Sequence, residues 1–466
     1  SLSNSPIVIG LSSECRIRHF LKSISFSLYY NFNNKRNKEK GVRFMNVFLK
    51  NADFRRFSVA SFLSGAGDIL FYLAFMTYAS KLQNYSLALS LIAISESVPK
   101  LFEIFGGYLA DKTKKKFRNI FLAAFVRFIL YGLVGLLFIT KMSQWNLVLI
   151  IVVVNFLSDT IGSYSGGLVA PLIVDIVGKK EYGNAVGFNG GVNQIISMGA
   201  QFIGSALLLV MSYSTLAFVN AGTFLLAGLL FASVGLKHQK DQKPLEKQEV
   251  NDQNFFQTMK TSLTQVKKQS GLLTVVLVIA LLNGALDTIT PLTTIVLAAH
   301  RSTMLIGTYS FTIALFGVIT GAGFALGSMF GPQLFKKLTV FSLVIISASL
   351  SIVTTTSIFL GNTYVIMITM FFLAAIAGVA SIKMEQWLVT SVDHKILAST
   401  VGLLNTILMA VAPIMTTVLT TISGSFNVTV ALVTLLVIQV ITLIVAIFVS
   451  LKTRKVTQNS NEVAAA

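Results

Sequence analysis

Twelve long apolar stretches recur along the chain, and they constrain its fold more than any other feature. A helix of about 20 apolar residues crosses the roughly 30 Å hydrocarbon core of a bilayer. Of the 466 residues, 54% are hydrophobic and only 12% are charged, and this composition excludes a soluble protein. We therefore expect an all-α polytopic membrane protein with twelve transmembrane helices. The stretches lie at about residues 54–79, 86–110, 118–140, 145–170, 184–211, 214–236, 271–298, 304–330, 338–360, 363–387, 397–422 and 427–450.

Lysine and arginine are distributed unevenly between the loops. If both termini are cytoplasmic, 31 of the 37 basic residues lie on the cytoplasmic side, three lie within stretches and three lie outside. Cytoplasmic loops of membrane proteins carry this excess, so the opposite orientation is excluded. The net charge of +19 follows from the topology. Nucleic acid is not an expected partner, because no basic domain with interleaved aromatic residues is present.

The loop after the second apolar stretch reads Gly-Gly-Tyr-Leu-Ala-Asp-Lys-Thr-Lys-Lys-Lys over residues 106–116. Here the chain resembles the major facilitator superfamily of secondary transporters, whose corresponding loop carries Gly-x-x-x-Asp-x-x-x-(Arg/Lys)-(Arg/Lys). Gly107, Asp111, Lys115 and Lys116 match this motif, and Lys114 stands where the family has a further glycine. The resemblance implies a gating loop. The alternative is a cationic loop that only contacts the anionic membrane surface.

Three sequence landmarks occur twice in the same order, at offsets of 219, 220 and 215 residues. This spacing argues for a duplicated six-helix unit. The resemblance implies two pseudo-symmetric six-helix bundles, related by an axis along the membrane normal. The second basic loop has Gly331 in place of the aspartate. The paired landmarks are Gly65–Asp68 with Gly284–Asp287, Gly107–Lys116 with Gly327–Lys336, and Val186–Gly187 with Val401–Gly402.

The domain organisation follows from this duplication. We expect a first bundle over residues 45–236 and a second over 271–455, with a C-terminal tail over 456–466. Residues 1–44 are polar and basic, and we expect a disordered N-terminal extension or a start-site artefact. Residues 237–270 form a cytoplasmic linker. Apolar residues at three-to-four spacing between Phe255 and Val266 predict an amphipathic helix in it, which either tethers the halves or regulates them.

Three acids, Asp68, Asp159 and Asp287, lie within the first, fourth and seventh stretches. A charge near the bilayer centre costs roughly 3 kcal/mol, and none of the three has a basic residue three or four positions away in its own stretch. In the resembled family these helices line the central cavity. The resemblance therefore implies acids that face a water-accessible pathway, that no basic residue of the first, fourth or seventh stretch opposes, and that bind protons or a cationic substrate. The alternative is a carboxylate that is hydrogen-bonded to a neighbouring helix for packing.

A second group of charges lies in the second and third stretches. Glu96, Lys100 and Glu103 are spaced by four and three residues and so share one helical face, where they can neutralise one another. A structural role is the first interpretation, and gating or proton relay is the alternative. Arg127 has no acidic residue in its own stretch and requires a carboxylate elsewhere, with Glu96, Glu103 or Asp159 as candidates. These residues are the predicted intramembrane charge network.

Small residues in the fifth stretch predict close helix packing, above all Gly187, Gly199 and Gly204. Exporters of the resembled family have a Gly-Pro motif in this helix. Here Ala200 follows Gly199, so the motif is incomplete.

The sequence contains no pattern that indicates enzyme activity. The four histidines lack metal-ligand spacing, Cys15 lies outside the apolar stretches, and no glycine loop resembles a nucleotide site. We expect no enzyme activity, no metal and no cofactor.

A finer resemblance, over residues 45–455, is to the macrolide-efflux-type drug:proton antiporters. It rests on Gly65–Asp68, Gly107–Lys116 and Ala185–Gly187. It implies proton-coupled efflux of amphipathic cationic or weakly basic compounds by alternating access. The expected partners are a small amphipathic substrate, protons and the lipid bilayer, with the chain acting as a monomer in a bacterial cell membrane. The alternatives are a carrier of other cargo or direction, such as a nutrient importer or a lipid or peptide exporter, and a non-transporting membrane scaffold or sensor.

Overall fold

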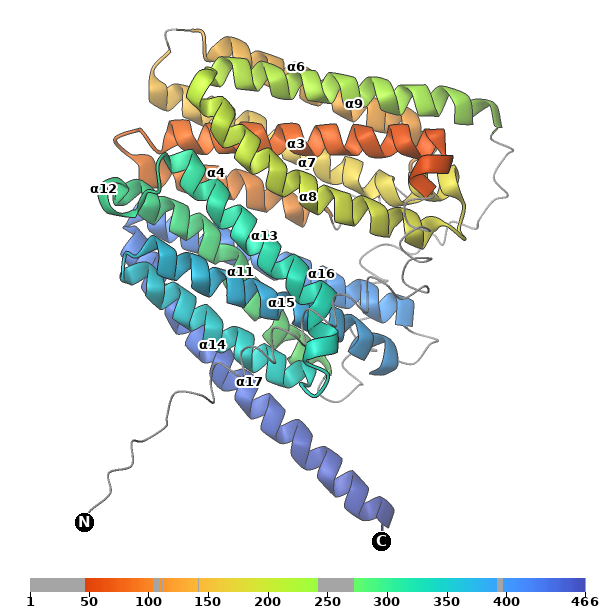
Figure 1. Ribbon diagram of the computed structural model, residues 1–466, viewed down its shortest axis with the longest axis vertical. Helices are drawn as coiled ribbons and strands as arrows, with labels where there is room; N and C mark the ends of the chain where they lie inside the picture. Colours follow the sequence, from red (N-terminus) through yellow and green to blue (C-terminus); the bar gives the residue numbers. More distant parts are fainter. Residues whose placement is uncertain are drawn as a thin grey trace, which may run out of the picture. The chain divides into compact units, whose positions relative to one another are not determined.

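The computed structural model describes residues 47–103, 109, 112–140, 142–241, 272–391 and 397–465. Within these ranges the regular structure is entirely helical, with twelve long helices (Figure 1). Six precede residues 242–271 and six follow. The first six are α3 (Ala52–Ala79), α4 (Tyr85–Leu101), α6 (Lys116–Leu137), α7 (Gln144–Val177), α8 (Tyr182–Val210) and α9 (Tyr213–Asp241). The second six are α11 (Leu272–Ala299), α13 (Tyr309–Leu334), α14 (Val340–Phe359), α15 (Thr363–Ser391), α16 (Leu397–Ser425) and α17 (Val428–Ala465).

Eleven of these helices are long and apolar enough to cross a membrane over the residues that the structure describes. The twelfth, α4, is described as a helix of 17 residues. A helix satisfies its backbone hydrogen bonds internally, which is the condition for crossing hydrocarbon. The predicted all-α fold with twelve transmembrane helices is therefore confirmed.

Several helix ends differ from the predicted boundaries. The helix α7 continues through Pro171 to Val177, and α17 continues to Ala465 through the predicted tail. The eighth span was expected to begin at residue 304. Instead, Arg301–Met304 form a separate short helix, α12, and α13 begins at Tyr309.

Local chemistry explains this late start of α13. Gly307 has a φ of +69°, which the backbone of an L residue rarely adopts, and it turns the chain between α12 and α13. The hydroxyl of Thr308 then accepts a hydrogen bond from the Phe311 amide at 3.1 Å and caps the new helix.

The described residues form two compact units. One unit combines the residues up to Arg55 with Ile173–Val192, and in it the Asn51 amide donates to the Ile176 carbonyl oxygen at 3.1 Å. The other unit comprises Arg56–Leu172 and the residues from Asn193 onward. It contains all the intramembrane charges that the sequence predicted.

Within the larger unit, α6 packs along α9 and α13 packs along α15 (Figure 1). The α13–α15 contact is close enough to require glycine. A Cβ on Gly323 would lie 2.5 Å from the carbonyl oxygen of Phe371, and one on Gly378 would lie 2.5 Å from that of Phe324. Small residues let helix backbones approach in this way. The helix α4 packs against α11 and α16, and its residue Lys100 lines a cavity whose walls come mostly from the second half of the chain.

Several predicted features lie outside the described residues. These are residues 1–44, most of the linker over 237–270, and Gly107 and Asp111 of the basic loop.

Candidate functional site

Arg127 of α6 is the centre of a buried polar cluster. Its Nη2 donates to both carboxylate oxygens of Asp68 on α3, at 3.1 and 3.0 Å, and to Oδ1 of Asp159 on α7 at 3.4 Å. Its Nε donates to the Ser158 hydroxyl at 2.8 Å, and the guanidinium lies over the Phe224 ring of α9, 4.1 Å from its centroid. Three other helices thus hold the guanidinium of Arg127 by hydrogen bonds and a cation–π contact.

No basic residue of the first, fourth or seventh stretch was expected beside Asp68 or Asp159, and the structure pairs both acids with Arg127 of the third stretch. The partner comes from a third helix, which spacing within one stretch cannot reveal. Of the carboxylates considered for Arg127, Asp159 is found beside it and Asp68 had not been considered. The Asp68 side chain is 33% exposed, so it keeps access to open space although it is paired.

Asn155 connects this cluster to Glu96 of α4. Its side-chain nitrogen donates to Glu96 Oε1 at 2.9 Å and to Asp159 Oδ2 at 3.1 Å. The Tyr131 hydroxyl donates to its amide oxygen at 2.9 Å and fixes the amide orientation. Asn155 was not predicted from the sequence. It precedes Asp159 by four residues and so shares its helical face, which was the available signal.

The cluster contains more acid than base. Asp68, Asp159 and Glu96 oppose the single guanidinium of Arg127, so the formal charge would be −2 with every carboxylate ionised. Holding excess negative charge away from water is costly, and a bound proton lowers that cost. Across the described residues, no group of three or more His, Cys, Asp or Glu side chains could hold a metal ion.

Lys100 and Glu103 are placed differently. Both side chains are exposed, and neither forms an ion pair within 4 Å with another described residue. The ammonium group of Lys100 attracts the carboxylates of Glu96, Glu103 and Asp287 through space. Glu96, Lys100 and Glu103 therefore form no ion pair with one another, and Glu96 instead accepts a hydrogen bond from Asn155.

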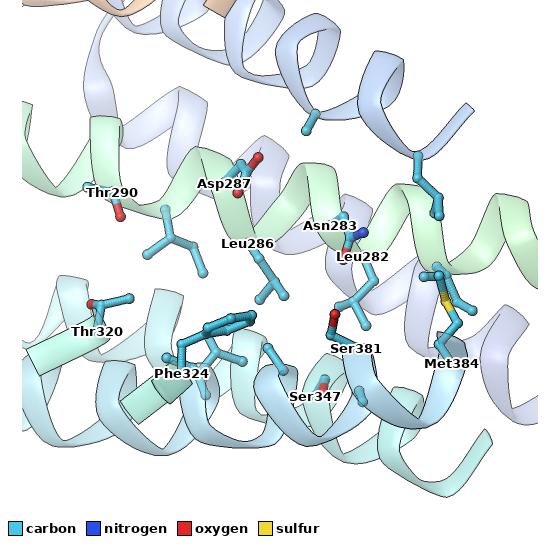
Figure 2. A pocket seen from close by; sticks show the side chains of 18 of the residues that line it. Leu282, Asn283, Leu286, Asp287, Thr290, Thr320, Phe324, Ser347, Ser381 and Met384 are labelled. Carbon is cyan, nitrogen blue, oxygen red and sulfur yellow. The ribbon is translucent and has the colours of Figure 1, made fainter. Parts of the chain in front are cut away.

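Asp287 of α11 lines a cavity of about 610 Å³. Figure 2 shows Asn283, Asp287 and Thr290 along α11, with Thr320 and Phe324 of α13 on the opposite wall. The helices α14, α15 and α16 supply most of the remaining wall, and Lys100, Glu103 and Gln194 complete it from the first half of the chain. Asp287 is exposed to this space, whereas Asp68 and Asp159 are partly buried.

The described part of the basic loop is anchored to α7. Thr113 and Asn119 both lie within hydrogen-bond distance of the Tyr164 hydroxyl, each at 2.9 Å. Lys116 donates from its ammonium group to the Thr113 carbonyl oxygen at 2.9 Å, and Lys115 is the residue that precedes α6. The base of the predicted gating loop is thus attached to the same helix that carries Asp159.

The three glycines predicted for packing in α8 differ in their surroundings. A Cβ on Gly204 would lie 3.0 Å from Leu70 Cδ2 of α3, so the helices approach closely there. A Cβ on Gly199 would meet no atom within 4 Å, and Gly187 is exposed. Close packing in α8 is therefore found at Gly204 and not at Gly199.

Comparisons with known proteins agree with this architecture. A family model described as Major Facilitator Superfamily matches residues 128–416. A variant of the nucleoside transporter NupG has a TM-score of 0.65 at 11% identity over 85% of this chain and 99% of its own. A bacterial homologue of the human lysosomal transporter Spinster has a TM-score of 0.58 at 14% identity, over 86% of this chain and 97% of its own.

An auto-inhibited peptide transporter of the POT family has a TM-score of 0.64 at 12% identity, over 86% of this chain and 96% of its own. At these identities the likeness shows a shared fold. A comparison with curated protein sequences gave no match.

Proposed function

The chain belongs to the major facilitator superfamily, and we propose that it is a proton-coupled exporter of amphipathic cationic or weakly basic compounds. The observation that carries the proposal is the exposed carboxylate of Asp287 in a cavity with mainly apolar walls. The two predicted halves, residues 45–236 and 271–455, would alternate around this cavity in the cell membrane, with both termini cytoplasmic.

The cavity suits an amphipathic cation in size and charge. A volume of about 610 Å³ lies within the range of about 300–1,000 Å³ that small-molecule sites occupy. The charged groups among its described lining residues are Asp287, Glu103 and Lys100, which leaves one negative charge in excess. Phe324, Met370 and other apolar side chains would cover the hydrophobic part of the substrate.

The proton would bind to the cluster around Arg127. Asp68, Asp159 and Glu96 exceed the one guanidinium in charge, and a proton shared among them reduces this excess. Intramembrane acids of this kind mark proton pathways in transporters. Asp68 and Asp159 keep the role that the sequence suggested, with Arg127 as their common counter-ion.

Other carriers of the superfamily move other cargo, and the charge of the cavity distinguishes a cationic cargo from an uncharged one. Nucleoside and peptide transporters are among the proteins with a similar fold. Carriage of an uncharged cargo would not need the excess negative charge of the cavity. A membrane scaffold or sensor would need neither the cavity nor the connected acids.

Transport in everted membrane vesicles tests the proposal. Vesicles that contain the protein should accumulate a lipophilic cation such as ethidium when a proton gradient is imposed, and a proton-sensitive dye should report the gradient falling as the cation enters. Vesicles with the Asp287→Asn variant should lose most of this exchange. If an uncharged nucleoside or a dipeptide dissipates the gradient and no cation does, the proposed cargo is wrong.

A further inference from the structure

We propose that Lys100 is a resident cation that competes with the substrate for Asp287 and moves toward Glu96 when the substrate binds. This inference rests on the proposed function, because Lys100 would connect cation binding in the cavity to proton binding in the cluster around Arg127. Lys100 would be a positioning residue, since it acts through the two carboxylates on either side of it.

Lys100 and Asp287 share one cavity although they come from different halves of the chain. Both line the space of about 610 Å³, together with Glu103. The helices that carry them, α4 and α11, pack against each other. A flexible ammonium group and an exposed carboxylate therefore face the same volume.

The two residues also lie at a similar depth along their helices. Arg301, just after α11, donates to the carbonyl oxygen and the hydroxyl of Ser80, in the loop between α3 and α4, at 2.5 and 2.6 Å, which links the chain segments beside these helix ends. Counting from these ends at about 1.5 Å per residue, Lys100 lies about 22 Å from Tyr85 and Asp287 about 18 Å from Ala299. The difference is less than one helical turn.

Lys100 has no fixed partner among the described residues, unlike Arg127 and Lys383. Arg127 is held by two aspartates and Ser158. The Lys383 ammonium donates to the carbonyl oxygens of Phe335 and Leu338, each at 2.6 Å. Lys100 is exposed and makes no hydrogen bond or ion pair with any described residue. Its four-carbon stem is therefore free to move the charge between neighbouring acids.

Three carboxylates attract this charge, and a substrate would change the balance between them. Asp287 lines the same cavity, Glu96 lies four residues before Lys100 on α4, and Glu103 lies three residues after it, just beyond the end of α4. A cation bound to Asp287 neutralises it and repels the ammonium group. The positive charge of Lys100 then acts mainly on Glu96 and Glu103.

The movement of the Lys100 ammonium group toward Glu96 explains why a proton is released. The polar and titratable groups that face Glu96 are Asn155 and Asp159 of α7, Asp68 and Tyr72 of α3, Tyr131 of α6 and Lys100 of its own helix. A positive charge that approaches Glu96 favours its ionised form, so a proton held there leaves to water. Cation binding and proton release thus become linked, and by reciprocity protonation favours release of the substrate.

Binding of tetraphenylphosphonium to purified protein in detergent tests the inference. Wild type, Lys100→Met, Lys100→Arg and the exposed-loop control Lys180→Met are compared by calorimetry, with a pH dye to count released protons. Lys100→Met should bind the cation about tenfold more tightly, because an internal competitor is absent, and should release fewer protons per bound cation. Lys100→Arg should restore proton release, and Lys180→Met should match wild type.

The outcomes separate this inference from the proposed function. If wild type binds no cation, both are wrong. If wild type binds the cation and releases protons, while Lys100→Met binds with the same affinity and releases as many, the inference alone is overturned. Lys100→Gln replaces Lys100→Met should the latter fail to fold, and the same two readouts decide.

Discussion

Arg127 of α6 binds both carboxylate oxygens of Asp68 of α3 through one nitrogen, Nη2, at 3.1 and 3.0 Å. The guanidinium group is 9% exposed and therefore depends on this pair and on Asp159 for its neutralisation. The pair ties the first and third transmembrane helices together. Protonation of Asp68 would therefore weaken the link between those two helices.

Replacing Arg127 should destabilise the protein more than replacing its partner. Arg127→Met leaves Asp68, Asp159 and Glu96 without a guanidinium, and breaking a buried pair in this way costs about 3–5 kcal/mol. Asp68→Asn should cost less, because Asp159 still neutralises Arg127. Thermal unfolding in one detergent measures both variants. Equal melting temperatures for Arg127→Met and wild type would contradict the role of the pair.

Asp68→Asn should separate proton coupling from substrate binding. Asparagine retains a hydrogen-bond acceptor for Arg127 but cannot exchange a proton. Proton-driven accumulation of a cation should therefore be lost, while binding of the cation to Asp287 persists. Vesicle uptake and calorimetric binding test the two halves of this prediction. Wild-type accumulation by Asp68→Asn would contradict the assignment of Asp68 to the shared proton site.

Asn155→Ala should weaken the link between Glu96 and Asp159. The substitution removes the amide that donates to both carboxylates, and loss of such buried hydrogen bonds costs about 1–3 kcal/mol. Tyr131→Phe is the matched control, because it removes only the donor to the Asn155 oxygen. Unfolding midpoints should rank wild type above Tyr131→Phe and Tyr131→Phe above Asn155→Ala. The reverse order of the two variants would contradict the bridging role.

Gly323→Ala should destabilise the α13–α15 contact, whereas Gly199→Ala should be tolerated. A Cβ at position 323 would lie 2.5 Å from the Phe371 carbonyl oxygen, and one at position 199 would meet no atom within 4 Å. Overpacking of this kind costs about 1–3 kcal/mol. Thermal stability of the two variants in detergent is the measurement. A loss of stability confined to Gly199→Ala would show that the close helix contact lies elsewhere.

The sequence could predict the helices because each apolar stretch is a local property of the chain. The pairing of Arg127 with Asp68 could not be predicted, since the two residues are 59 positions apart and the helix rotations that bring them together depend on packing between helices. The four-residue spacing placed Glu96 and Lys100 on one face of their helix, but it could not show whether their side chains form an ion pair. Asp287 was identified as an intramembrane acid, while its cavity required the walls of α13, α14 and α15.

Proton release on cation binding to wild type and to Asp287→Asn tests the account most directly. Purified protein in weakly buffered detergent is titrated with tetraphenylphosphonium while a pH dye reports released protons. The account predicts saturable release by wild type. For Asp287→Asn it predicts at least about tenfold weaker binding and no release at the concentration that saturates wild type. Equal binding and equal release by the two proteins would contradict the assignment of Asp287 as the cation site.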